Sequence, residues 1–114
     1  MAQIISKSTF MRGLQCEKFL WLSKNERDLR DTPSSARKSI IGTGEVVGEI
    51  ARELFPDGLD LSIGPDMNLE KALEDTRKAI DSDQEIIYEA AFSFNGLYVA
   101  VDILVKDPEG WKVF

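Results

Sequence analysis

Hydrophobic positions recur at helical spacing over the first two thirds of the chain. The helices that this spacing predicts cover residues 9–24, 37–55 and 68–80. Ser8 and Asn68 are suitable N-caps for the first and the third of them. The segments 31–35 and 56–58 are rich in turn-forming residues and separate the helices, and residues 59–66 are predicted to be a loop.

From Glu85 onward the period changes from helical to alternating, which is typical of strands. The predicted strands cover residues 85–94, 97–106 and 111–114. Asn95-Gly96 separates the first two and favours a two-residue hairpin, because a type I′ turn needs positive φ at both central positions. We therefore expect one α/β domain over residues 1–114, with N-terminal helices packed on an antiparallel β-meander.

The hairpin register brings two carboxylates together. A two-residue turn pairs Phe94 with Leu97 and so places Glu89 opposite Asp102, on a face flanked by small residues. The other face is almost wholly apolar, and we expect the helices to cover it. Like charges about 5 Å apart repel by about 3 kcal/mol at an effective dielectric near 20. Mg²⁺ or Mn²⁺ bound between the carboxylates would turn this repulsive arrangement into a favourable one. Alternatively, this face is simply hydrated, or Lys106 or Lys112 neutralises the pair.

Composition narrows the possible chemistry. The 114 residues carry 14 basic and 20 acidic side chains, a net charge of −6, yet residues 1–38 hold eight basic and only four acidic groups. The positive charge of that segment could bind phosphate groups. There is no histidine, which excludes His-dependent nucleophiles, and Cys16 is the single cysteine, which excludes an internal disulfide. An apolar run of 18 residues and a secretory signal pattern are both missing, so we expect a cytoplasmic protein without membrane contact.

Two further patterns bear on partners. Gly42, Gly44 and Gly48 within the second predicted helix suggest the close approach of another backbone or a ligand. The last predicted strand stops while still apolar, so we expect the chain to be the truncated N-terminal part of a larger domain. The positions that would complete the acidic face then fall just beyond Phe114. The exposed edge of that strand makes a homodimer possible.

The chain resembles the PD-(D/E)XK nuclease superfamily, in the branch of the RecB-like and CRISPR-associated exonucleases. The matching segments are Y-E-A-A-F (88–92), V-D-I-L (101–104) and G-W-K-V-F (110–114), together with S-K-S-T-F (6–10), L-Q-C-E-K-F-L-W-L (14–22) and G-E-V-V-G-E-I-A (44–51). Asp102 matches the family's aspartate, and the Glu-x-Lys triplet would begin after Phe114. The resemblance implies a partial restriction-endonuclease-like fold.

The resemblance also implies a function, the metal-dependent hydrolysis of DNA phosphodiesters. Asp102 would be catalytic and bind Mg²⁺ or Mn²⁺, with Glu89 as an auxiliary ligand. Gly48 stands where many relatives have a histidine, and Glu45 or Glu49 could supply an oxygen ligand instead. The side chains expected to contact DNA phosphates are Arg12, Lys18 and Lys38.

In some relatives the cysteine that Cys16 matches is one of four iron–sulfur ligands, whose other three would lie downstream. Otherwise Cys16 is a small buried helix residue. The chain alone is expected to be inactive, because it lacks part of the catalytic set. The alternative is a non-catalytic α/β interaction module of degenerate nuclease origin.

Overall fold

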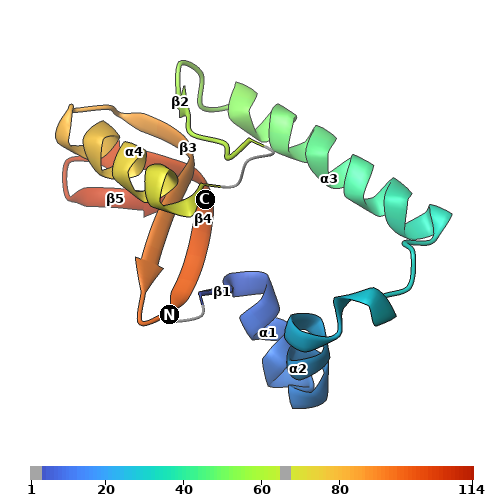
Figure 1. Ribbon diagram of the computed structural model, residues 1–114. Coiled ribbons are helices and arrows are strands. Elements are labelled where there is room, and N and C mark those ends of the chain that lie inside the picture. Colours follow the sequence, from blue (N-terminus) through green and yellow to red (C-terminus); the bar gives the residue numbers. More distant parts are fainter. Residues whose placement is uncertain (1–3, 65–67) are drawn as a thin grey trace.

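The computed structural model describes residues 4–64 and 68–114, which form helices and one mixed sheet (Figure 1). The helices are α1 (Lys7–Gln15), α2 (Glu17–Asn25), α3 (Ser35–Glu53) and α4 (Leu69–Asp81), with a short 3₁₀ helix η1 (Arg27–Leu29). The strands are β1 (Ile5–Ser6), β2 (Leu59–Asp60), β3 (Ile86–Phe94), β4 (Leu97–Asp107) and β5 (Gly110–Val113). The predicted α/β class is confirmed.

The β3–β4 hairpin is the centre of the sheet. Asn95 and Gly96 have φ of 48° and 77°, and Phe94 pairs with Leu97 as predicted. β5 returns antiparallel along β4, which confirms the meander. Two short strands were not predicted: β1 lies parallel to the start of β4, and β2 lies parallel to β3. The loop predicted over residues 59–66 is therefore wrong at β2, and its residues 65 and 66 lie outside the described residues.

The first predicted helix is two helices. Cys16 adopts an extended conformation, with φ of −157° and ψ of 107°, and ends α1 before α2 begins. Ser6, not Ser8, caps α1 by accepting a hydrogen bond from the Thr9 amide. A Cβ at the buried Gly13 would lie 2.9 Å from a methyl carbon of Leu20, so the two helices meet closely at this glycine. Cys16 is exposed, so the prediction of a buried helix residue is wrong.

The core lies between α4 and the hairpin. The buried apolar cluster comprises Ala79, Ile87, Ala90, Val101 and Leu104. The buried Thr76 hydroxyl of α4 accepts a 2.8 Å hydrogen bond from the Ala91 amide, which ties the helix to β3. Strict alternation would put Ile87 and Ala90 on opposite faces. They nevertheless share one core, and Glu89 between them has a φ of 57°, which departs from regular strand geometry within the continuous strand β3, so the predicted division into two faces is wrong across this point.

α3 does not cover the sheet as predicted, but extends away from it (Figure 1). Its large apolar side chains are mostly exposed, including Ile40 at 72% and Leu54, its C-cap, at 76%. A Cβ at Gly42, Gly44 or Gly48 would meet no atom within 4 Å. Within the described residues, no other backbone of the chain approaches these glycines, whereas the approach of a ligand stays a prediction. None of the described helices combines the length and the apolar character needed to span a membrane.

Candidate functional site

Glu89 and Asp102 lie across from each other at the centre of the hairpin. The flanking pairs are Tyr88 with Ile103 and Ala90 with Val101, and they set the predicted register at this point. Both acidic residues line one pocket of about 800 Å³, whose other wall is formed by α3. Asp102 is exposed and Glu89 is partly buried, so solvent reaches the pair from the pocket.

Two features make Glu89 unusual for a strand residue. Its positive φ is in the left-handed region, which non-glycine residues rarely occupy and which clusters at functional sites. Burial raises the pKa of its carboxyl above the ordinary value, and the nearby Asp102 raises the pKa further, while Arg52 acts in the opposite direction. The charged form of Glu89 is thus disfavoured by its surroundings unless a cation accompanies it.

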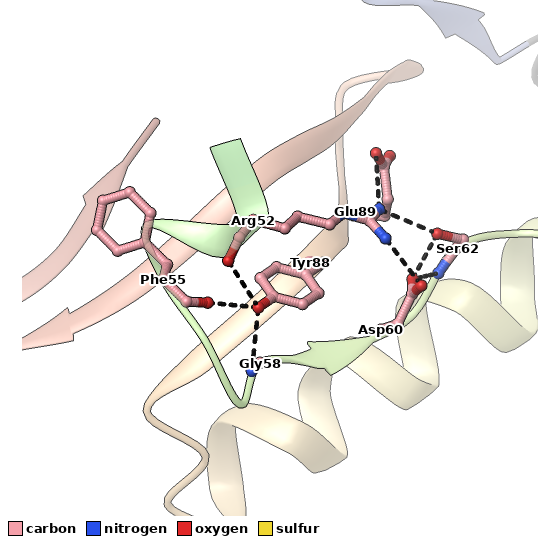
Figure 2. Close-up of polar contacts among 7 residues, drawn as sticks. All are labelled: Arg52, Phe55, Gly58, Asp60, Ser62, Tyr88 and Glu89. Carbon is pink, nitrogen blue, oxygen red and sulfur yellow. Dashed lines mark hydrogen bonds and ion pairs between the residues drawn. The ribbon is translucent and has the colours of Figure 1, made fainter. Parts of the chain in front are cut away.

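Arg52 of α3 is the cation that the sequence analysis missed. Its Nη1 lies 2.9 Å from Asp60 Oδ2, its Nη2 lies 3.6 Å from Glu89 Oε1, and the guanidinium stands 4.8 Å from the centre of the Tyr88 ring (Figure 2). Arg52 comes one helical turn after Gly48, on the face that lines the pocket, and this spacing is the signal that could have identified it.

The two lysines proposed as alternative partners of the acidic pair point elsewhere. Lys106 forms an ion pair with Asp83 at 2.7 Å, and Lys112 forms one with Asp107 at 2.5 Å. The alternative that either lysine neutralises Glu89 and Asp102 is therefore wrong. The cation beside Glu89 comes instead from a helix, as Arg52 of α3.

Tyr88 fixes the end of α3 over the sheet. Its hydroxyl donates to the Phe55 carbonyl and accepts a 3.2 Å hydrogen bond from the Gly58 amide (Figure 2). A Cβ at Gly58 would lie 2.3 Å from the Tyr88 ring, so a glycine is required where the turn crosses the tyrosine. The rings of Phe55 and Phe114, 4.8 Å apart, add an apolar contact at the same junction.

The other candidate metal ligands line the same pocket as the pair but do not complete a metal site. Glu45 and Glu49 line the pocket from α3. Across residues 4–64 and 68–114, however, no three acidic or cysteine side chains gather closely enough to hold a metal ion. Glu89 and Asp102 fit a hard cation in ligand type, since both offer carboxylate oxygens, but two carboxylates occupy only part of its shell.

The candidate phosphate contacts are Arg12 on α1, Lys18 on α2 and Lys38 on α3, all of them exposed. The Arg12 guanidinium lies 5.6 Å from the centre of the Phe19 ring. In the described part of the chain, none of these three side chains forms an ion pair. They are separate from the Glu89–Asp102 pair, since none of them lines its pocket.

Comparison with family models, with curated proteins and with solved structures gives no match to this chain. The case for a function therefore depends on the residues of the pocket and on the motifs in the sequence.

Proposed function

We propose that the chain is the N-terminal part of a divalent-metal-dependent DNA nuclease of the PD-(D/E)XK superfamily, acting in the cytoplasm. The observation that carries the proposal is the placement of Glu89 and Asp102 between the same two flanking pairs of the hairpin, with both residues lining one pocket. Two adjacent acids in a partly buried site destabilise a sheet unless a cation binds there. The family resemblance supplies the identity of that cation, Mg²⁺ or Mn²⁺.

The side chains of the site have distinct roles in this proposal. Asp102 and Glu89 would hold the metal ion, which supplies Lewis-acid stabilisation of the phosphoryl oxygen and a water of lowered pKa. Arg12, Lys18 and Lys38 would contact the DNA backbone without reading sequence. Cys16 would join an iron–sulfur cluster only if a longer protein supplied three more ligands.

The geometry of β5 indicates where a longer protein would complete the site. Phe114 exchanges two backbone hydrogen bonds with Ile103, of 2.9 and 3.3 Å. A strand that continued in this register would bring its next residue beside Asp102, which is where the resemblance places the glutamate of Glu-x-Lys. Without that glutamate the metal shell is incomplete, so we propose that the 114-residue chain does not cut DNA.

The test is Asp102→Asn in a protein that extends past Phe114. We expect Mn²⁺-dependent cleavage to be abolished, while the melting temperature and DNA affinity stay near the wild-type values. A structural ion-pair partner would instead lose stability, and a solvated strand residue would show no effect. Asp83→Asn is the matched control, because this exposed acid pairs with Lys106 away from the pocket. Full cleavage by Asp102→Asn would refute the assignment.

The second candidate is a non-catalytic interaction module. The exposed apolar side chains of α3 favour it, since a large unburied apolar surface is typical of a protein interface. A homodimer could also form through the edge of β5, which pairs with β4 and, among the described strands, with no other. The codons that follow Phe114 in the gene discriminate between the candidates: Glu-x-Lys favours the nuclease, and two apolar residues favour the module.

A further inference from the structure

Arg52 is the only basic side chain among the described residues that line the pocket, which also holds four carboxylates. These carboxylates belong to Glu45, Glu49, Glu89 and Asp102. The guanidinium therefore supplies the only positive charge that the described chain itself brings into this cavity. Any ligand that enters meets an acidic surface with one fixed cation at its edge.

The contacts of Arg52 differ in strength. The contact with Asp60 is a 2.9 Å hydrogen-bonded ion pair, and the guanidinium also stacks over Tyr88. The Ser62 hydroxyl lowers the pKa of Asp60, an effect that burial opposes and Arg52 reinforces, so Asp60 stays ionised as its partner. The contact with Glu89 is 3.6 Å long, beyond hydrogen-bond distance. Arg52 can thus lose Glu89 and keep its other partners (Figure 2).

We propose that Arg52 is a positioning residue that serves as the internal counter-cation of Glu89 and gives up this one contact when a divalent cation binds at Glu89 and Asp102. The inference rests on the metal site of the proposed function. It adds that Arg52 of α3 compensates the charge of Glu89 when no metal is bound. The helix that forms the opposite wall of the pocket is thereby linked to the charge state of the acidic pair.

The proposal and a purely structural role of Arg52 predict opposite effects of its removal on metal affinity. If Arg52 competes with the metal for Glu89, removing its charge tightens metal binding. If Arg52 only anchors α3, its removal loosens the pocket and weakens binding. One unit charge at this range, discounted because the Arg52 side chain is 30% exposed, corresponds to about a three- to tenfold change in affinity.

The experiment measures Mn²⁺ binding to the 114-residue chain through the electron paramagnetic resonance signal of the free ion. Arg52→Gln should bind about three- to tenfold more tightly than wild type, and Arg52→Lys should bind within twofold of it. Arg37→Gln is the matched control, because it removes the same charge from the exposed start of α3 and should change affinity less than twofold. Asp102→Asn should lose most of the binding.

A double-mutant cycle tests the pair without metal. In metal-free buffer, we expect Arg52→Gln to change the unfolding equilibrium constant about threefold less in the Glu89→Gln background than in wild type. Should Arg52→Gln not fold, Arg52→Met replaces it, since the methionine keeps an apolar stem over Tyr88.

The outcomes separate the two proposals. Absence of coupling in the cycle overturns the inference. Asp102-dependent Mn²⁺ binding that Arg52→Gln weakens or leaves unchanged also overturns it, while the metal site of the proposed function stands. If none of the variants shows Mn²⁺ binding that depends on Asp102, the two carboxylates do not bind a metal ion in this chain and the inference is overturned, while cleavage by the longer protein still tests the proposed function.

Discussion

Tyr88→Phe removes one oxygen atom and should release the turn that joins α3 to the sheet. The hydroxyl now accepts a hydrogen bond from the Gly58 amide at 3.2 Å and donates one to the Phe55 carbonyl, and it is partly buried. Phenylalanine would leave a backbone donor and acceptor without these partners. Each poorly compensated group costs about 1–3 kcal/mol, and access of water to the turn reduces this, so we expect a total loss of about 2 kcal/mol in the free energy of unfolding.

The assay is urea denaturation followed by circular dichroism, with amide hydrogen exchange at Gly58 as a local probe. Tyr98→Phe is the matched control: it makes the same chemical change on β4, where the tyrosine hydroxyl forms no hydrogen bond within the described residues. We expect Gly58 to exchange faster in Tyr88→Phe alone. If the two variants differ by less than about 0.3 kcal/mol and Gly58 stays protected, the hydroxyl does not hold the turn, and the reasoning is refuted.

Three further predictions concern the pocket. Glu89→Gly should be more stable than Glu89→Ala by about 1 kcal/mol, because glycine tolerates the φ of 57°; chemical denaturation showing the opposite order would indicate an ordinary strand. Asp102→Asn should lower the pKa of Glu89 in a carbon-13 NMR titration. Because the pKa of Glu89 is raised by folding, the free energy of unfolding should fall as the pH rises above the ordinary value of 4.5, and Glu89→Gln should reduce this fall. Gly48→Ala should raise the free energy of unfolding by about 0.5–1 kcal/mol, because its Cβ meets no atom within 4 Å; a loss would reveal a packed helix face.

The sequence predicted the hairpin well because its determinants are local. Asn95-Gly96 selects the turn, the turn sets the register, and the register places Glu89 opposite Asp102. The Asn68 cap of α4 was also predictable, since its side chain accepts a hydrogen bond from the amide of Lys71, three residues later in the chain. In each case, neighbours within a few residues decide the conformation.

The failures have a different cause, because each depends on packing that periodicity does not encode. The break at Cys16 accompanies the packing of Leu20 against Gly13, seven residues earlier, which a single helical stripe does not reveal. The other two failures depend on contacts between residues distant in the chain. β2 has only two residues and exists because it pairs with β3. The partner of Glu89 lies on α3, 37 positions earlier in the chain, so strand periodicity could not identify Arg52.

The positive φ at Glu89 argues that stability alone does not account for this residue. A regular strand with apolar residues would avoid three unfavourable features that meet here: a left-handed backbone at a residue with a side chain, a partly buried carboxyl, and a second acid nearby on the neighbouring strand. Arg52 offsets one of them through a contact of 3.6 Å, and Asp102 forms no ion pair within the described residues. An apolar pair at these positions would remove the like-charge and burial costs together. The cation site that we propose would offset these costs, because a bound cation turns the repulsion between the two carboxylates into an attraction for a shared ion.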